Sequence, residues 1–476
     1  MSGKLKSVAM AAWDWIDDRT GVSKTVWPLM THLVPRGAKW WYVFGSATLC
    51  AFIVQIVSGV ALAFSYIPSS DEAFTSLKYI SEVAPLGNFL RGMHYWGAGM
   101  MVLMVGIHML QVFLSGAFKF PREATWLSGL FLFALVLGMA FTGQLLRWDQ
   151  NAVWSVMLAA EAAGRIPFIG DLLARIILGG ETIGGATLNR FYVVHVFIIP
   201  GLMISLIVMH LYLVLRHGIA EPPVKGKPVD PKTYRKEYED ELKKTGVPFF
   251  PDAAWRDIVF ALGVILVIAS AALFIGPPAI GGAPDPSVID AQPRPDWYFL
   301  WLFAIMALMP DGLENLAIIF GPVIIGSILV LLPFLFGTGE RHPARRPWAV
   351  TIVILTIISI IALWIAGAKA DWSPDFKAQP LTAEIVGTTT GPVATGATLF
   401  YEKSCLRCHL IEGHGGRRGP DLTYVGDRLT KDQMIIRIMN GGHNMPSFAG
   451  ILKPNELESI VAFLQSRARK VGPKNQ

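Results

Sequence analysis

The sequence predicts an all-α fold, in which a seven-helix transmembrane bundle of four plus three helices is followed by a small all-α domain. Hydrophobic residues make up 53% of the chain and charged residues only 16%, a composition that is rare in soluble domains. Several apolar runs are long enough to cross a ~30 Å hydrocarbon core. Beyond residue 367 the chain becomes polar, which marks the end of the membrane part. An open sheet is excluded from the bundle because unpaired backbone groups are costly in lipid.

The apolar runs predict seven helices and the domain limits. The expected helices cover residues 40–63, 93–114, 125–146, 190–215, 257–276, 314–336 and 347–367. The expected domains are an N-terminal segment at 1–39, a four-helix domain at 40–220, a connector at 221–250, a three-helix domain at 251–368, a linker at 369–392 and a final domain at 393–476. In the N-terminal segment, Trp13, Trp15 and Ile16 lie among aspartates, which fits either a short amphipathic helix on the membrane surface or a solvated tail.

Basic residues predict the orientation of the bundle. If the N-terminus is cytoplasmic, the inner segments carry many more Lys and Arg than the outer loops, as topogenesis requires. Seven crossings then place the C-terminal domain outside, in the periplasm of a bacterial cell. The net charge of +6 comes from inner loops and the tail, so it reflects topology and does not predict nucleic-acid binding.

Two histidine pairs lie inside long apolar runs, where ionisable side chains usually mark function. His108 follows His94 by 14 positions, and His210 follows His195 by 15. These intervals are about 21–23 Å along a helix and return the side chain to roughly the same face. If the two helices face each other, His94 with His195 and His108 with His210 can each hold one haem as axial ligands, near the outer and inner surfaces respectively.

Glycines repeat the histidine interval. Gly45 and Gly59 lie in the first expected helix, Gly129 and Gly143 in the third, and both pairs are 14 positions apart. They therefore offer patches without side chains at the two haem levels, with ordinary close helix packing as the alternative.

The outer loops add charged groups near the first histidine of each run. Arg91 precedes His94 and Arg190 precedes His195, so both are expected to pair with the propionates of the outer haem. A second outer loop contains Pro295-Asp296-Trp297-Tyr298. The acid could simply be solvated, or it could accept a proton beside a quinol site.

The polar C-terminal part contains Cys405-Leu406-Arg407-Cys408-His409, the C-x-x-C-H attachment signature of a c-type haem. Cys405 and Cys408 would form the thioethers and His409 would be the proximal ligand. Met445 is the expected sixth ligand, with His414 and His443 as alternatives. The remaining cysteine, Cys50, is expected to be a small buried hydrophobe.

These residues resemble a known family. The first 220 residues resemble the four-helix cytochrome b of the plant and cyanobacterial plastoquinol complex, and about 250–370 resemble its three-helix partner, here joined in one chain. The marks are the two histidine pairs, Trp148-Asp149-Gln150 and the Pro-Asp-Trp-Tyr motif. The last 80 residues resemble a single-haem cytochrome c.

The resemblance implies a cytochrome bc type quinol oxidoreductase with two b-type haems, one covalent c-type haem and quinol. Quinol would be oxidised outside, with Asp296 accepting a proton and Tyr298 orienting it. One electron would go to a Rieske iron–sulfur protein, and the other would cross through the b haems to an inner quinone site at Asp257 and His217, which Arg216 could join.

The resemblance also implies departures and partners. Val43 stands where plant-type relatives carry a cysteine that holds an extra haem, and Arg147 replaces the usual proline before Trp148. The chain contains no Rieske signature, so the iron–sulfur protein is expected as another chain, with an electron-accepting cytochrome or oxidase and a homodimeric complex. By analogy, Asp296 favours menaquinol over ubiquinol or plastoquinol.

Two other functions compete with this interpretation. A dihaem membrane anchor, which only links another enzyme to the quinone pool, would need the histidines but neither the Pro-Asp-Trp-Tyr loop nor the extra helices. In a structural or transport bundle, the histidines would bind no haem iron.

Overall fold

The computed structural model describes residues 3–285, 294–309, 313–369, 378–416, 419–441 and 445–469. In this part of the chain, seven helical stretches are long and apolar enough to cross a membrane: Phe44–Ala63, Gly87–Leu114, Glu123–Leu145, Gly185–His217, Phe249–Ile275, Leu313–Leu335 and Pro347–Lys369. The all-α fold and the seven spans are therefore confirmed. The second, fourth and fifth spans begin earlier than the hydropathy predicted, and the first begins later.

Four of the spans form a bundle of two helix pairs. Its helices are α3 (Phe44–Ala63), α5 (Gly87–Leu114), α6 (Glu123–Leu145) and α9 (Gly185–Val193), which continues through a π-helical turn at Val194–Ile198 into α10 (Ile199–His217). Helix α3 packs along α5, and α6 packs along α10. The centre of the bundle is filled by an apolar cluster drawn from all four helices: Ala51, Phe52, Met101, Val105, Val136, Ile199 and Met203. This cluster separates the two ends of the bundle.

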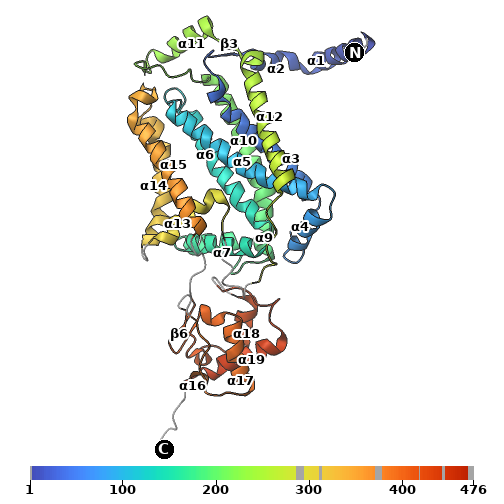
Figure 1. Ribbon diagram of the computed structural model, residues 1–476, viewed down its shortest axis with the longest axis vertical. Coiled ribbons are helices and arrows are strands. Elements are labelled where there is room, and N and C mark those ends of the chain that lie inside the picture. The colour runs from blue at the N-terminus through green and yellow to red at the C-terminus, as the bar shows by residue number, and fades with distance from the viewer. Residues whose placement is uncertain are drawn as a thin grey trace, which may run out of the picture.

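The other three spans flank the four-helix bundle (Figure 1). They are α12 (Ala254–Ser270, which continues into a π-helical turn at Ala271–Ile275), α14 (Leu313–Leu335) and α15 (Pro347–Lys369). Helix α12 packs against α3 and α5, whereas α14 packs against α6. The shorter apolar helix α13 (Trp297–Leu308) packs on α15. The second half of the chain thus holds the first half from two sides.

Short elements close the two ends of the bundle (Figure 1). One end, called the α7 end, carries α4 (Ala73–Glu82), α7 (Gln150–Gly164), α8 (Gly170–Leu178) and α13. The other, called the α11 end, carries α1 (Gly3–Thr20), α2 (Val22–Thr31), α11 (Tyr234–Thr245), and two antiparallel pairs, β1 (Leu33–Val34) with β3 (Val247–Pro248) and β2 (Pro228–Val229) with β4 (Gly339–Glu340). The segment around Trp13 and Trp15 is helical, and its contact with a membrane surface stays a prediction.

Four basic side chains are buried at the α11 end and cap helix C-termini. Lys119, Arg122, Arg341 and Arg346 are each less than 7% exposed. Their hydrogen bonds go to backbone carbonyls: Arg346 to Phe113 and Leu114, Arg341 to Ser115, Arg122 to His217 and Gly218, and Lys119 to Phe336 and Thr338. The last carbonyls of a helix lack partners and carry partial negative charge, so cations stabilise them. Cations of each half of the chain therefore cap helices of the other half.

The charges of this cluster are partly compensated. Burial, together with the nearby Arg346 and Arg341 guanidinium groups, lowers the pKa of Lys119 to about 8. Lys119 is therefore still mostly protonated at neutral pH. The Arg341 guanidinium lies 2.8 Å from the Glu221 carboxylate, which also accepts the Tyr234 hydroxyl at 2.8 Å.

The C-terminal domain is a compact helical unit beyond the α7 end (Figure 1). It contains α16 (Ala383–Val386), α17 (Gly391–Glu402), α18 (Lys431–Asn440), α19 (Pro454–Ser466) and the hairpin of β5 (Leu410–Ile411) with β6 (His414–Gly415). Helix α17 crosses α19 at Gly396, where an added Cβ would lie 1.9 Å from the carbonyl oxygen of Ser459. One helix before the C-x-x-C-H motif, α17, and one after it, α19, are thus packed together.

Glu221→Gln is expected to lower the free energy of unfolding by about 3 kcal/mol, because it leaves the buried Arg341 charge without its carboxylate. Thermal unfolding of the purified protein measures the loss. The matched control is Glu82→Gln, which breaks an exposed pair with Lys78 at 4.0 Å and should change stability by less than ~0.5 kcal/mol. Equal effects of the two variants would contradict the role given to Glu221.

Candidate functional site

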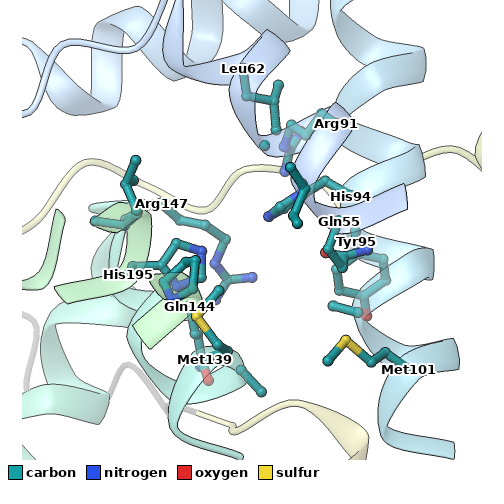
Figure 2. Close-up of a pocket in the computed structure, with 18 of the residues that line it drawn as sticks. Gln55, Leu62, Arg91, His94, Tyr95, Met101, Met139, Gln144, Arg147 and His195 are labelled. Carbon is teal, nitrogen blue, oxygen red and sulfur yellow. The ribbon is translucent and has the colours of Figure 1, made fainter. Parts of the chain in front are cut away.

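The structure brings His94 and His195 together at the α7 end. Their ring centroids are 6.3 Å apart with the ring planes at 76°. Both rings line a cavity of about 280 Å³ inside the four-helix bundle. Figure 2 shows the two imidazoles on opposite walls of this cavity, one on α5 and the other on the facing helix. The predicted pairing across two helices is thus present at this level.

A π-helical turn reconciles the unequal histidine intervals. His195 lies in the turn Val194–Ile198, where the N–H of Ile199 donates to the carbonyl of Val194, five residues back. A π turn accommodates more residues than an α turn and is common at functional sites. The interval from His195 to His210 can therefore be one residue longer than that from His94 to His108 and still present both rings on one face.

Each of the four predicted glycines faces one of the four histidines. A Cβ added to the glycine would approach the ring Cε1 of its histidine: Gly45 to His108 at 3.2 Å, Gly59 to His94 at 3.1 Å, Gly129 to His210 at 3.3 Å and Gly143 to His195 at 2.6 Å. The glycines lie at the histidine levels, as the spacing predicted. What they directly accommodate is the imidazole edge from the neighbouring helix.

Hydroxyl groups hold three of the imidazoles. The Nδ1 atoms of His94, His195 and His210 lie 3.0, 3.0 and 2.8 Å from the hydroxyls of Ser58, Thr142 and Ser128. Each hydroxyl donates its own proton to a backbone carbonyl within its helix. With its own proton used in this way, each hydroxyl can accept from Nδ1–H, an assignment in which the Nε2 of the neutral imidazole carries no proton.

Unprotonated Nε2 with a hydrogen-bonded Nδ1 is the usual state of a metal-ligating histidine. Together with the cavity between the rings and the glycine clearances, it fits axial ligation of a haem by His94 and His195. Among the described residues, none gives His108 Nδ1 a hydrogen-bond partner.

A local sequence pattern marks these three hydroxyl residues. Ser58, Ser128 and Thr142 each directly precede one of the predicted glycines. At the fourth position the order is reversed, since Ser46 follows Gly45. Its hydroxyl bonds Asp257 instead of an imidazole.

The structure brings only one of the two predicted propionate partners to the cavity. Arg91 is 8% exposed and lines the cavity, where it donates to the hydroxyl of Ser81 at 3.1 Å and to the carbonyl of Pro278 at 2.6 Å. Arg190 is exposed, donates to the carbonyl of Ile176 at 3.3 Å and is not among the residues that line the cavity. The sequence missed Arg147, which lies in the cavity wall.

The same cavity reaches the Pro-Asp-Trp-Tyr motif at the start of α13. The Tyr298 hydroxyl donates to Asp296 Oδ2 at 2.9 Å, and both side chains line the cavity. The Trp148-Asp149-Gln150 stretch is hydrogen-bonded to the chain that precedes α13. The backbone N–H of Gln150 donates to the carbonyl of Gly282, and its side-chain amide donates to the carbonyl of Asp285.

The two residues predicted for the inner quinone site have different surroundings. Ser46 donates to Asp257 Oδ1 at 2.5 Å, next to the glycine that faces His108. The carbonyl of His217 accepts from Arg122, and its Nδ1 has no hydrogen-bond partner among the described residues. A shared site for Asp257 and His217 stays a prediction.

The C-terminal domain arranges its motif for a covalent haem. The backbone N–H of His409 donates to the carbonyl of Cys405 at 3.0 Å, and its Nδ1 pairs with the carbonyl of Pro420 at 2.9 Å, which leaves Nε2 as a ligand. Met445 packs against the core of the domain, whereas His414 is exposed in the hairpin. Met445 as sixth ligand stays a prediction, and His443 lies outside the described residues.

Comparisons with known proteins divide the chain in the same order. Residues 29–218 match the family "Cytochrome b/b6/petB", 283–383 match "Cytochrome b(C-terminal)/b6/petD", and 391–464 match "Cytochrome C oxidase, cbb3-type, subunit III". Cytochrome b6 of Synechococcus sp. (strain JA-3-3Ab) is 39% identical over 210 residues, which is 44% of this chain and 98% of that protein. The chain belongs to the cytochrome b family.

Other cytochrome b relatives agree. Cytochrome b6 of Heliobacterium modesticaldum is 39% identical over 211 residues, 44% of this chain and 99% of that protein. A solved structure described as "Hyperthermophilic respiratory Complex III" has a TM-score of 0.63 and 28% identity, and covers 75% of this chain and 91% of that one. This cytochrome b is accordingly a haem-binding, multi-pass membrane protein. It is an electron-transfer subunit of a multi-subunit oxidoreductase complex of the cytochrome bc type.

Gly143→Ala is expected to displace His195, because the new methyl group would lie 2.6 Å from its ring and overpacking costs ~1–3 kcal/mol. The b-type haem content per chain should fall, which optical difference spectra measure. The control is Gly201→Ala in α10, where an added Cβ meets no atom within 4 Å. If Gly143→Ala retained the b-haem content and spectrum of the unaltered protein, the clearance argument would be wrong.

Proposed function

We propose that this cytochrome b is a cytochrome b–c fusion subunit of a quinol:cytochrome c oxidoreductase, and that it oxidises quinol in the cavity at the α7 end. One observation carries the proposal. A single cavity joins the His94–His195 pair to the Asp296–Tyr298 pair. A proton acceptor therefore lies in the same enclosed space as a pair of haem ligands.

The wall chemistry of the cavity suits a quinol. Most of its lining residues are apolar, and the polar ones include Asp296 and Tyr298 at the start of α13. An apolar pocket with few polar groups binds a hydrophobic ring and orients it by those groups. Asp296, which accepts the Tyr298 hydroxyl at 2.9 Å, can instead accept a quinol hydroxyl. It then takes the proton while Tyr298 orients the second oxygen.

Cofactor roles follow from the ligand positions. His94 with His195 would hold one b haem and His108 with His210 a second, while Cys405, Cys408 and His409 would hold a c haem with Met445. When bound, these haems supply one-electron carriers between the quinol site, an inner quinone site near Asp257 and His217, and an external acceptor. The apolar cluster around Met101 and Met203 excludes water between the two b levels.

The orientation rests on charge. The connector and the buried cations put basic residues at the α11 end, which fits a cytoplasmic surface. The α7 end and the cytochrome c domain would then lie on the periplasmic side, with a cytoplasmic N-terminus. The proposal keeps the six domains expected from the sequence, with limits at 1–39, 40–220, 221–250, 251–368, 369–392 and 393–476.

The partners follow from the reaction. Two-electron oxidation of quinol with one b-haem path needs a second one-electron acceptor at the same site. A Rieske iron–sulfur protein in another chain fits this role, and an acceptor cytochrome or oxidase would receive electrons from the c haem. The assembly is proposed as a homodimer.

The alternative of a dihaem anchor predicts no role for Asp296 and Tyr298. In the structure, Trp148-Asp149-Gln150 is bonded to the loop that leads to these two residues, and both face the cavity. An anchor has no need of this arrangement, so the arrangement supports quinol oxidation at this site.

Asp296→Asn combined with Tyr298→Phe is expected to lower the quinol turnover number by ~10²-fold or more, because it removes the proton acceptor. Steady-state quinol oxidation measures the effect, with haem content as the check on folding. Asp171→Asn removes an exposed carboxylate on α8 that is paired with Arg175 outside the cavity, and it should leave turnover unchanged. Full turnover in the double variant would overturn the proposed quinol site.

Purification from native membranes is expected to recover a second chain that carries a Rieske-type [2Fe–2S] cluster, since this chain holds no such signature. Electron paramagnetic resonance of the reduced complex detects the cluster. A complex with full quinol-to-cytochrome turnover and no [2Fe–2S] signal would exclude the Rieske partner.

A further inference from the structure

Arg147 presents a buried charge to the cavity at the α7 end. It follows the C-terminal end of α6, and its side chain is 20% exposed. Figure 2 shows its guanidinium directed from the end of α6 into the space between His94 and His195. Arg147 and Arg91 therefore both face the space next to the two imidazoles.

The described residues satisfy little of this charge. Arg147 Nε is buried without a hydrogen bond, and its ion pair with Asp149 Oδ2 is 3.6 Å long. Asp149 is already engaged, since Oδ1 accepts the N–H of Ala152 at 2.8 Å and Oδ2 faces the N–H of Gly281 at 3.4 Å. The one ion pair of the guanidinium among the described residues is thus a long one, with a carboxylate that has other partners.

The second cation, Arg91, has no hydrogen bond to a carboxylate among the described residues. Arg91 donates to a hydroxyl and to a backbone carbonyl. Asp296, which also lines the cavity, accepts the Tyr298 hydroxyl. The wall beside the histidines is therefore positive, and buried positive charge calls for a counter-charge from the bound ligand.

The backbone holds Arg147 in this position. The next residue, Trp148, has a φ of 46°, in the left-handed region that bulky residues rarely adopt. Its indole is buried and donates to the carbonyl of Ser70 at 3.0 Å. Such a conformation persists only where the surroundings enforce it, and here it directs the preceding side chain into the cavity.

We propose that Arg147 binds a propionate carboxylate of the haem held by His94 and His195, in the role that the sequence suggested for Arg190. The inference rests on the proposed function. A guanidinium binds a carboxylate through two parallel N–H···O bonds, whereas a neutral quinol offers no charge to balance. A positive charge at the propionate favours the reduced form of the haem, so we expect Arg147 to raise the reduction potential of this haem.

The test is a redox titration of the purified protein, followed through its b-type absorption bands. In Arg147→Gln, one of the two b-haem transitions is expected to shift down by at least ~59 mV, a tenfold change in a one-electron equilibrium, while the other stays. Arg190→Gln removes an exposed arginine of α9 that does not line the cavity, and it should move neither transition. Arg147→Lys keeps the charge and should restore most of the potential.

The possible outcomes separate the two proposals. If the unaltered protein shows no pair of b-type transitions, the proposed function fails. If it shows both but Arg147→Gln shifts neither, or shifts both equally, only the role of Arg147 fails. If Arg147→Gln binds no haem at the His94–His195 level, the reduction potential of Arg147→Lys is compared with that of the unaltered protein. A near-normal potential supports the role of the charge, and a potential lowered by ~59 mV or more contradicts it.

Discussion

The structure depends on how a neutral imidazole is held inside a closely packed bundle. A buried histidine needs room for its ring and a partner for Nδ1–H, and a helix surface offers neither without special residues. At His94, His195 and His210 a glycine supplies the room, and the hydroxyl residue just before it supplies the acceptor. Because the hydroxyl proton is used within its own helix, Nε2 is left as the free lone pair that a metal needs.

Buried cations perform a comparable task at the α11 end. Helix C-termini that meet there would leave carbonyls unpaired. Lys119, Arg341 and Arg346 bond them across the two halves of the chain, and Arg122 bonds them within the first half. This arrangement accounts for how a four-helix part and a three-helix part remain associated when lipid supplies no hydrophobic driving force between helices. Arg147 and Arg91 differ from this cluster because they face a cavity instead of helix ends.

Sequence reasoning reached the histidine quartet, the four glycines and the C-x-x-C-H motif because each is a local or periodic pattern. Arg190 was expected to bind a haem propionate because it is near His195 in the chain, but it does not line the cavity. Arg190 points outward on its helix, whereas Arg147, far away in the chain, reaches the cavity after the turn at Trp148. The hydroxyl partners were visible as Ser-Gly and Thr-Gly pairs, but their function requires knowledge of which ring they face.

The sequence by itself determined the class of the protein and the number of spans, and it supplied the candidate haem ligands. Hydrophobic length and ligand spacing follow from one-dimensional patterns, which a bilayer and a straight helix translate directly into structure. The tertiary structure decided which polar groups share a cavity and how the unequal histidine intervals are accommodated. Side-chain direction depends on helix rotation, and a single π-helical turn at His195 changes that rotation without leaving a mark in composition or hydropathy.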